Sequence, residues 1–548
     1  MKKVLYIALF AMVALLMVGC KNKDSATDAS QYQFQLILDD YSELRESIVV
    51  NVTLKDDLGQ LVNSEVKAEL TKKGDTTIIS SKKLTFDATT KATEIKFTKL
   101  TAVTDYTLTI YTGYNGVRVD LLVKDLRTSD LGTETNPYIL KTKDDFTKYL
   151  KNDRAAYFEL GCDVDFGGKG VNPLFTSSSA FTGHFDGKGY TIKNYVVADY
   201  DTEGNMTYIN TSTQYYGLFG YIGTTGVVKN VNLEDSIIHI ARKNTMSSSQ
   251  TLYYGLLAGY NSGVVENINV VNADINVKST NRTEKLLTIG GLIGMNTGQG
   301  TVTKVSVDAN IKVSGVIDVT VGGVVGTTLN AETVVKEFEG VSKNVANISE
   351  ASFDGTINVD IVGSNGYDAN TIVGGILGRN YRALVDDCHS SGQIVVKTSY
   401  TSLQSPKIVV GGLVGWNIND NARLTNSTSS IAFDVTTFDT PAEEGEVAEI
   451  NVGLLVGING GDRLPAYAKV SNCEYTLAEG AENVINVVTV DNRVVVNAGL
   501  VGNAVSENGV DTNKSNSDLE IVINYHALNE ETKEYEKTGE FQKVTISK

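Results

Sequence analysis

Two pairs of carboxylates are the residues best suited to acid–base chemistry in this sequence, Asp163 with Asp165 and Asp386 with Asp387. Polysaccharide lyases and hydrolases use clustered acids of this kind, in which carboxyl groups transfer protons or hold a cation. Asp386-Asp387 occupies a slot that another copy of a repeat fills with Ser471-Asn472, which favours a solvent-facing turn pair. The first pair has too few ligands at fixed spacing for a calcium loop. Neither pair is therefore predicted to be catalytic.

The four histidines do not predict a metal site or a catalytic triad. His184, His239, His389 and His526 lie far apart, and no two have the spacing of metal ligands. No nucleophile elbow and no Ser/His/Asp order accompanies them. The sequence therefore predicts no catalytic residue, no metal ion and no cofactor, and the chain is not expected to be an enzyme.

Tyrosines are the candidates for ligand binding, because they are interpreted as carried by insertion loops that precede a recurring glycine segment. Insertions at one corner of a repeat project from one edge of the stack, where partners often bind. An aromatic face stacks on the C–H groups of a sugar, and neighbouring amides bond its hydroxyls. The alternative is that these are tolerated surface loops without a ligand. The insertions are residues 197–214, 241–252, 277–287, 362–371, 398–406 and 437–449, and the candidate tyrosines are Tyr200, Tyr208, Tyr215, Tyr253, Tyr367 and Tyr400.

A repeated segment must position these tyrosines. One copy is Val410-Gly411-Gly412-Leu413-Val414-Gly415-Trp416-Asn417, and its closing glycine recurs at intervals from 32 residues (Gly294 to Gly326) to 52 residues (Gly326 to Gly378). Such intervals are typical of stacked repeat arrays. Short β-branched runs follow each copy, so the pattern predicts three strands per repeat. The closing glycines are Gly220, Gly259, Gly294, Gly326, Gly378, Gly415, Gly457 and Gly502.

Three strands per turn describe one coil of a parallel β-helix, whose coils stack at about 4.8 Å. The apolar residue two positions before each closing glycine, from Leu218 to Leu500, is predicted to fill the interior. The predicted fold class is all-β, an N-terminal antiparallel β-sandwich followed by a three-strand-per-coil parallel β-helix. Two positions after the glycine, five copies have an asparagine that could join a hydrogen-bonded ladder: Asn261, Asn296, Asn380, Asn417 and Asn459.

These Gly-Leu-x-Gly copies with a trailing asparagine resemble the GLUG motif repeat of bacterial surface and adhesin-type proteins. The resemblance covers about residues 130–503, with the repeats themselves in 215–503, and the copy at Gly326-Thr327-Thr328 departs from it by lacking the asparagine. It implies a β-helical architecture and a surface location. It implies no catalytic residues.

The N-terminus has the pattern of a lipoprotein signal peptide. Lys2-Lys3 precede an apolar run from Val4 to Val18, and Gly19-Cys20 follow, so residues 1–19 are the predicted signal and Cys20 the predicted lipidation site. Residues 20–33 are polar and predict a flexible tether. The alternative is an ordinary secretory signal with a coincidental cysteine. No other apolar run reaches 18 residues, so the lipid is the only membrane attachment expected.

Residues 34–129 alternate as half-buried antiparallel strands do. Asn115-Gly116 between two such runs predicts a type I′ hairpin turn. Tyr106, six residues after Leu100, resembles the tyrosine corner of fibronectin type III and related Ig-like sandwiches. The domain is interpreted either as a binding module or as a spacer above the membrane.

An open β-helix end exposes strand edges and must be covered. Thr142 and Asp145 have the spacing of a helix-capping pair, which predicts a short helix through Leu150. This helix is the candidate lid over the open end. It belongs to a predicted cap and opening coil at residues 130–214. Residues 504–548 are interpreted as a C-terminal coil or cap. The segment Ala331–Gly340, inside the longest interval, is interpreted as a helical turn.

The net charge limits the classes of molecule that the chain is expected to bind. The formal net charge is −17 for the chain, and −17 − 2 = −19 without Lys2 and Lys3, which argues against nucleic acid because that partner requires clustered Lys and Arg. The sequence predicts an outer membrane lipoprotein, exposed on a bacterial surface, that adheres to an extracellular glycan or a host or matrix protein through its loops. The alternatives are a polysaccharide lyase or hydrolase on the same scaffold, and a structural stalk or accessory component of a surface complex.

Overall fold

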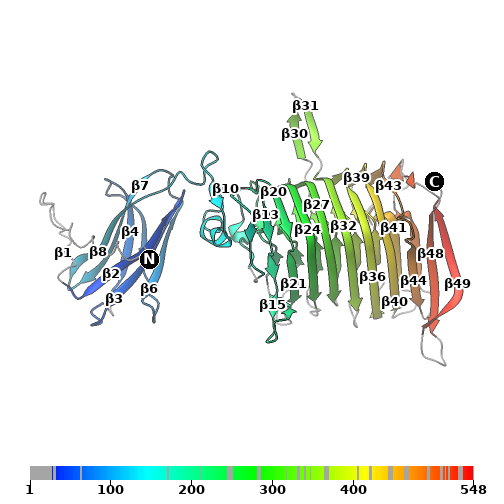
Figure 1. Ribbon diagram of the computed structural model, residues 1–548, viewed down its shortest axis with the longest axis horizontal. Coiled ribbons are helices and arrows are strands. Elements are labelled where there is room, and N and C mark those ends of the chain that lie inside the picture. Colours follow the sequence, from blue (N-terminus) through cyan, green and yellow to red (C-terminus); the bar gives the residue numbers. More distant parts are fainter. Residues whose placement is uncertain are drawn as a thin grey trace. The chain divides into compact units, whose positions relative to one another are not determined.

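The structure, a computed structural model, divides the chain into two compact units, Met1–Thr133 and Glu134–Lys548 (Figure 1). The residues that it describes are 27–28, 32–61, 64–168, 172–211, 213–242, 251–279, 286–315, 318–329, 334–338, 341–345, 347–362, 370–403, 407–418, 422–441, 448–461, 468–489, 494–505, 510–511, 514–515, 519–528 and 535–546.

The first unit is the predicted antiparallel sandwich, with one sheet in the order β2-β3-β6 and the other in the order β1-β8-β7-β4-β5. Only the short β1 pairs in parallel, with β8. The inward side chains of the two sheets share one core that includes Val50, Val52 and Leu108, none of which is exposed. The strands are β1 (Thr27–Asp28), β2 (Phe34–Glu43), β3 (Ser47–Asp56), β4 (Val66–Lys72), β5 (Ile78–Lys83), β6 (Ala92–Thr98), β7 (Asp105–Tyr114) and β8 (Val117–Arg127).

Two local sequence signals in the sandwich are confirmed. Asn115 and Gly116 join β7 to β8 with φ of 51° and 79°, and both central residues of a type I′ turn require such positive values. The Tyr106 side chain is 1% exposed, and its hydroxyl oxygen accepts a hydrogen bond of 2.9 Å from the Thr101 N–H. This bond ties the start of β7 to the preceding turn, as a tyrosine corner does.

The second unit begins with the predicted lid. Thr142 caps a short helical segment, α1 (Lys143–Asp145) continued by the π-helical turn η2 (Phe146–Leu150), and Asp145 accepts a 2.9 Å bond from the Thr142 N–H. Phe146 is 1% exposed and packs against Phe166 and Phe185 in the first coils. The helix lies at the end of the stack, as Figure 1 shows, and its Phe146 ring packs against apolar rings there.

The opening coils are built from very short strands. Parallel pairing runs from β9 through β10 to β12 and on to β20. One antiparallel hairpin, β15 with β16, departs from the stack. The elements are β9 (Tyr138–Leu140), β10 (Tyr157–Leu160), β11 (Val164–Asp165), the 3-10 turn η3 (Ser177–Ser179), β12 (His184–Asp186), β13 (Thr191–Lys193), β14 (Val196–Val197), β15 (Asp199–Tyr200), β16 (Met206–Thr207) and β17 (Ile209–Thr211).

Each repeat then contributes two short strands that flank the Gly-Leu-x-Gly bend, stacked in parallel in one 14-stranded sheet. We call the strand before the bend the first limb and the strand after it the second limb. First limbs are β18 (Tyr215–Tyr216), β22 (Thr251–Tyr254), β25 (Leu286–Gly290), β28 (Val319–Gly322), β33 (Thr371–Gly374) and β37 (Lys407–Gly411). Second limbs are β19 (Gly220–Ile222), β23 (Ala258–Asn261), β26 (Ile293–Thr297), β29 (Val325–Leu329), β34 (Leu377–Tyr381) and β38 (Val414–Ile418), whereas β41 (Ala448–Asn459) and β45 (Val494–Ala504) run through the bend.

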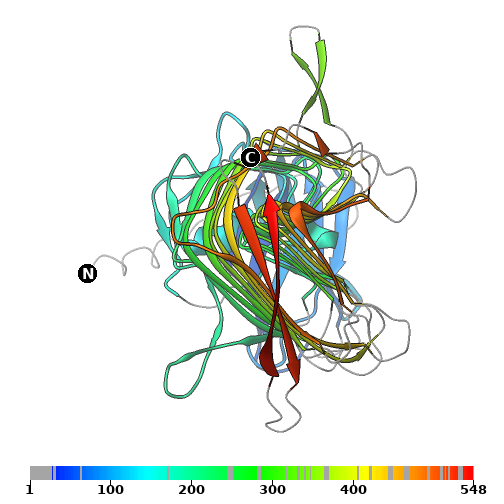
Figure 2. The same cartoon turned by 90° about the vertical axis from the view of Figure 1, so that its right-hand side faces the viewer.

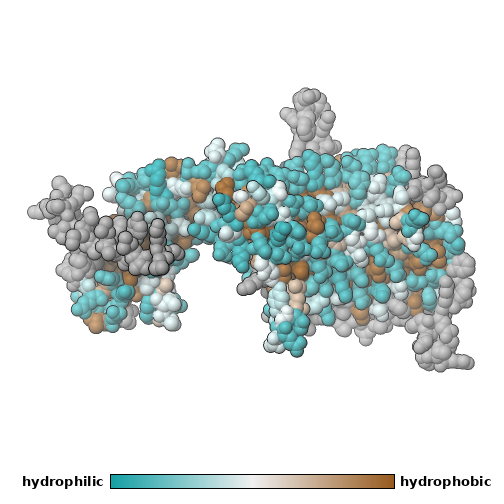
Figure 3. Space-filling view, viewed as in Figure 1, coloured by the Kyte–Doolittle hydropathy of each residue, from teal (hydrophilic) through white to brown (hydrophobic). Residues whose placement is uncertain are grey.

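A longer strand, split at a corner in some coils, completes each turn and forms the second parallel sheet, so the predicted three-strand coil is confirmed (Figures 1 and 2). Alternate side chains of β27 are buried, and the outward face in Figure 3 is mainly hydrophilic. These strands are β20 (Val227–Glu234), β21 (Ile237–Arg242), β24 (Val264–Ser279), β27 (Thr301–Gly315), β32 (Ile348–Val362), β35 (Leu384–Asp386), β36 (His389–Leu403), β39 (Arg423–Thr425), β40 (Thr428–Pro441), β42 (Lys469–Ser471), β43 (Glu474–Tyr475), β44 (Asn483–Thr489), β46 (Val510–Asp511), β47 (Lys514–Ser515) and β48 (Leu519–Leu528).

Two further hairpins interrupt the parallel order. At the C-terminal end, β49 (Tyr535–Ile546) pairs with β48 in antiparallel fashion. Within the longest repeat interval, β30 (Val334–Phe338) and β31 (Val341–Val345) form a hairpin that projects from one edge (Figure 1). The helical turn expected at Ala331–Gly340 is therefore wrong over residues 334–338, which form β30. The β-branched Val334 and Val335 favour a strand there.

The predicted interior column is confirmed through seven coils. Leu218, Leu257, Leu292, Val324, Ile376, Leu413 and Leu455 are each 0% exposed. In the last coil Leu500 is half-buried, so the column loosens there.

The predicted asparagine ladder is also confirmed. Asn380 donates to Asn417 at 2.9 Å, and Asn417 donates to Asn459 at 2.8 Å. In the coil that lacks the asparagine, Thr328 occupies the slot and donates to Asn380 at 3.1 Å. All of these side chains are 0% exposed, so the hydrogen bonds satisfy polar groups that water does not reach.

Candidate functional site

The structure brings two of the six predicted tyrosines together. Tyr215 of β18 and Tyr253 of β22 are register partners on adjacent coils, and their rings stack with centroids 5.7 Å apart and planes 7° apart. Both lie in first limbs, not in protruding loops. Stacking on neighbouring strands fixes both ring orientations before any ligand arrives.

Of the other four predicted tyrosines, the structure describes the side chains of two, and neither joins them. Tyr200 in β15 is 44% exposed and donates to the Gly168 carbonyl at 2.6 Å. Tyr208 lies beside His239, with ring centroids 5.8 Å apart. Tyr367 is outside the described residues, and so is the side chain of Tyr400, although its backbone belongs to β36. The predicted insertions 241–252, 277–287 and 362–371 fall largely outside the described residues, so the expected loop-bearing edge stays a prediction.

Two tyrosines that the sequence reasoning missed complete the cluster. Tyr221 of β19 and Tyr260 of β23 stack at 4.2 Å with planes 13° apart. Each meets Tyr215 edge to face, at 5.2 Å and 5.6 Å, and Tyr260 meets Tyr253 at 6.4 Å. We call Tyr215, Tyr221, Tyr253 and Tyr260 the tyrosine quartet. All four are half-buried, so part of each ring faces solvent.

The bend creates this arrangement because it folds the second limb back toward the first. A Cβ on Gly259 would lie 2.4 Å from the Tyr253 carbonyl oxygen, so only glycine allows the limbs to approach so closely. Side chains alternate along each limb: Tyr216 points inward and is 1% exposed, whereas Tyr215 points outward. The outward residues of both limbs therefore face one another across the bend.

A signal in the sequence could have found the missing pair. Tyr221 and Tyr260 each directly follow a closing glycine, so they hold the same outward slot in consecutive repeats. We call this slot the outer row. Its members are Tyr221, Tyr260, Met295, Thr327, Arg379, Trp416, Ile458 and Asn503.

Burial disfavours the charged phenolate form in three members of the quartet. Burial raises the pKa of both Tyr215 and Tyr253 above the usual value. The pKa of Tyr221 is raised further, by burial first and then by the neighbouring Tyr260 phenol. A neutral aromatic surface with phenolic hydroxyls at its edge suits sugar rings, which present C–H faces and hydroxyl groups.

Both carboxylate pairs take part in hydrogen bonds that link neighbouring segments of the solenoid. Asp163 accepts a 2.9 Å bond from the Thr191 N–H, and Asp165 accepts one of 3.0 Å from Asn194. Asp386 accepts bonds from the next coil, including one of 2.6 Å from Thr425. Within the described residues, no three His, Cys, Asp or Glu side chains are grouped so that they could hold a metal ion.

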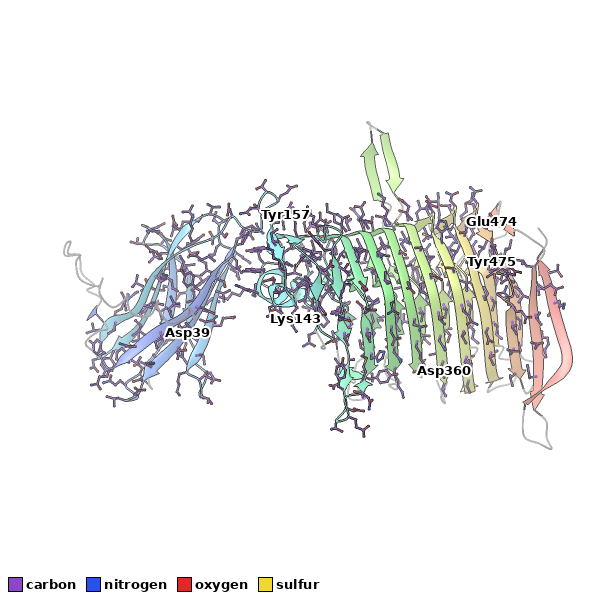
Figure 4. All side chains as sticks on the ribbon, in the orientation of Figure 1. Asp39, Lys143, Tyr157, Asp360, Glu474 and Tyr475 are labelled. Carbon is purple, nitrogen blue, oxygen red and sulfur yellow. The ribbon has the colours of Figure 1, made fainter. Side chains whose placement is uncertain are left out.

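Histidines and cysteines also belong to the stack. His184 stacks on Tyr157 at 4.3 Å at the start of the solenoid (Figure 4). His239 pairs with Asp274, with Nε2 and Oδ2 2.6 Å apart. The Cys388 thiol is buried, which raises its pKa to about 12 and keeps it protonated. Neither it nor Cys473 forms a disulfide.

No helix within the described residues is long and apolar enough to span a membrane. The predicted signal peptide, Cys20 and most of the tether lie outside those residues.

Comparison with known proteins finds short regions of likeness. No protein-family model matches the chain. It is 33% identical over 148 residues to a protein of Evansella cellulosilytica provisionally named a Gly-rich membrane protein, and 26% identical over 182 residues to halomucin of Haloquadratum walsbyi. The matches cover 25% and 31% of this chain but only 15% and 2% of those relatives.

Two solved structures are similar to the chain. One, from Bacteroides ovatus, is provisionally named an immunoglobulin A1 protease; it is 17% identical, with a TM-score of 0.35, and the match covers 65% of this chain and 78% of that one. The other is named IgA1 protease; it is 14% identical, with a TM-score of 0.33, and the match covers 81% and 29%. Both names denote an enzyme, which contradicts the prediction that this chain is not one. That prediction is withdrawn, and at these scores the likeness assigns no catalytic residue.

Proposed function

We propose that the chain is a surface lipoprotein of a bacterium whose solenoid binds an extracellular glycan, with the tyrosine quartet as its contact surface. The observation that carries the proposal is the packing of four half-buried tyrosine rings from two coils into one cluster. A protein partner that presents apolar and hydroxyl groups would use the same surface.

The quartet is prepared for binding. Each aromatic pair contributes about 0.5–1.5 kcal/mol beyond its buried area, so the rings hold one another in place. Side chains that are already ordered lose little rotamer freedom when a ligand stacks on them. This is the main advantage of strand-borne tyrosines over tyrosines on loops.

The anchoring part of the proposal rests on the sequence. Acylation of Cys20 would hold the chain at the outer membrane, and residues 20–33 would let the folded units move away from it. The resemblance to GLUG repeat proteins and the membrane-protein name of one relative agree with a place at the surface.

Binding is tested with the full-length protein, purified in detergent and applied to arrays of glycans and matrix proteins. Tyr221→Ala with Tyr260→Ala is expected to weaken binding at least tenfold, because it removes one stacked pair and uncovers the other. The matched control is Tyr200→Ala, which removes an exposed tyrosine outside the quartet and should bind as the parent does. Equal binding by the double variant would overturn the proposal, and binding to nothing on the arrays would favour a structural stalk.

Anchoring is tested in cells. Growth with labelled palmitate should label the protein, and Cys20→Ser should abolish the label and release the protein from membranes. Antibody staining of intact cells then tests exposure. Signal only after permeabilisation would place the protein in the periplasm and refute the surface assignment.

A further inference from the structure

A cation and an aromatic ring occupy the outer row farther along the solenoid. Arg379 of β34 and Trp416 of β38 are register partners on adjacent coils. Asn380 and Asn417, the next residues, are 0% exposed in the interior. Strand alternation therefore places Arg379 and Trp416 outward, in the same row as Tyr221 of the quartet.

Trp416 is rigidly held. It packs on a separate apolar cluster made by the buried residues Ile372, Val409 and Ile458. Its indole N–H donates to the Gly460 carbonyl at 2.8 Å. A ring fixed by packing beneath and by a hydrogen bond at its edge gives a firm wall for neighbouring groups.

Two cations lie against this wall. The Arg379 Cζ is 5.3 Å from the Trp416 ring centroid and 5.8 Å from that of Tyr381, and the Lys407 Nζ is 5.8 Å from Trp416. Lys407 also meets a carboxylate, Glu449, at 3.7 Å. No described carboxylate forms an ion pair with Arg379, and its Nε is buried without a hydrogen-bond partner among the described residues.

Another arginine stacked on an aromatic ring shows what is different about Arg379. The Arg118 Cζ lies 3.6 Å from the Tyr111 ring centroid in the sandwich. Its guanidinium is neutralised by Asp120 at 2.9 Å and by Glu69 at 3.4 Å. A guanidinium has five N–H donors and favours the paired oxygens of an anion. Arg118 has its anion within the chain, whereas none of the described carboxylates pairs with Arg379, although the chain has a net charge of −17.

We propose that Arg379 and Trp416 form an anion subsite that takes an acidic sugar, one that bears a carboxylate or a sulfate. This rests on the proposed glycan-binding function and names the class of glycan. Arg379 holds two oxygens of the acidic group through its paired N–H donors. Trp416 and Tyr381 keep the guanidinium plane in place, and Lys407 adds positive charge.

The distance to the tyrosine quartet sets the size of the ligand. In the outer row, Met295 and Thr327 separate Tyr260 from Arg379, so the two residues are three coil steps apart. At about 4.8 Å per coil that is roughly 14 Å. One extended oligosaccharide of several sugars, neutral at one end and acidic at the other, spans both contacts.

Trp416 is the only tryptophan of the chain, so its fluorescence reports on this subsite alone. The full-length protein is titrated with three matched oligosaccharides, one neutral, one with uronate sugars and one sulfated. We expect a saturable change with at least one acidic ligand, binding at least tenfold tighter than the neutral one, and weaker binding as salt is raised. The two acidic arms distinguish carboxylate from sulfate.

The variants separate this inference from the proposed function. Arg379→Lys should weaken acidic binding about tenfold and leave neutral binding unchanged, because a lysine lacks the paired donors. The matched control is Arg118→Lys, which should change neither. Equal affinity of parent and Arg379→Lys for every acidic ligand overturns the subsite, even if the quartet variants still lose binding. Loss of effect in the quartet variants, with Arg379 still required for acidic ligands, overturns the quartet's role instead.

Discussion

Two neighbouring slots of the same repeat follow opposite rules. The residue two positions after the closing glycine points inward, is asparagine or threonine from Asn261 to Asn459, and is 0% exposed in each of those coils. The residue before it lies on the other side of the strand and changes from tyrosine to methionine, threonine, arginine, tryptophan and isoleucine. Exposure in this slot also varies, since Met295, Thr327 and Ile458 are 3%, 6% and 3% exposed whereas the tyrosines are half-buried. Both slots lie on one strand, one residue apart.

The contrast shows where the repeat leaves room for function. An inward side chain must match its neighbours above and below, because a buried donor or acceptor without a partner is costly. An outward side chain meets fewer constraints from the stack, so its chemistry can differ from coil to coil. Recognition chemistry is therefore expected in the variable slot, and stability is expected to depend on the constant one.

Replacing an inward residue should have the largest effect on folding. Asn417→Leu removes the acceptor for Asn380 and the donor for Asn459. Each neighbouring amide loses one buried hydrogen bond, although Asn380 keeps its bond of 3.0 Å to the Ala383 carbonyl, so the free energy of unfolding should fall by about 3 kcal/mol. Urea unfolding followed by circular dichroism measures this.

The matched replacement in the variable slot is Ile458→Leu in the next coil, in the apolar cluster beneath Trp416; it keeps volume and polarity and should cost less than about 1.5 kcal/mol. If both variants unfold at the same urea concentration, the two slots do not differ as argued.

Adding one carbon at the bend should lower both the stability of the solenoid and the affinity of the tyrosine quartet. Gly259→Ala places a Cβ 2.4 Å from the Tyr253 carbonyl oxygen and 2.6 Å from the Tyr216 nitrogen. The limbs must separate, at a cost of about 1–3 kcal/mol, and the quartet should lose its edge-to-face contacts and its glycan affinity. The control is Gly113→Ala in the sandwich, where nothing lies within 4 Å of the added carbon. Unchanged stability of the Gly259 variant would mean that the limbs are not in close contact.

These cases show how far the sequence reached. The interior column and the asparagine ladder were predicted because their residue types recur at fixed positions, as stacking requires. Two members of the quartet were missed because Tyr221 and Tyr260 belong to a slot whose residue type varies. The tyrosines that were predicted to bind a ligand were sought in the insertions, where neither of these two lies. Facing contacts across the bend depend on how tightly the glycines fold the limbs together. The spacing of residues along the chain does not report that angle.

The coil that departs from the repeat offers a milder test of the inward slot. Thr328 donates to Asn380 at 3.1 Å and accepts from the Tyr381 N–H at 2.8 Å. Thr328→Val keeps the shape and removes the hydroxyl, so the free energy of unfolding should fall by about 1 kcal/mol, less than for Asn417→Leu. Urea unfolding of the two variants side by side gives the ranking. A larger loss for Thr328→Val would reverse the order expected when only a hydroxyl is removed from a side chain of unchanged shape, rather than a whole amide.

The smallest expected effect concerns the protonation of the Tyr221 phenol. Because the pKa of Tyr221 is raised above its usual value of 10.0 in the folded chain, the unfolded state loses this proton first as pH rises. The stabilisation that comes from the neutral phenol is therefore complete below pH 10 and is lost as pH rises toward the folded pKa. Tyr221→Phe has no proton to lose, so its stability should fall less steeply above pH 10 and should match the parent near pH 7. Thermal unfolding at a series of pH values measures both slopes, and Tyr200→Phe, outside the quartet, should follow the parent. Parallel slopes for Tyr221→Phe and the parent would show that the phenol is not held neutral by the quartet.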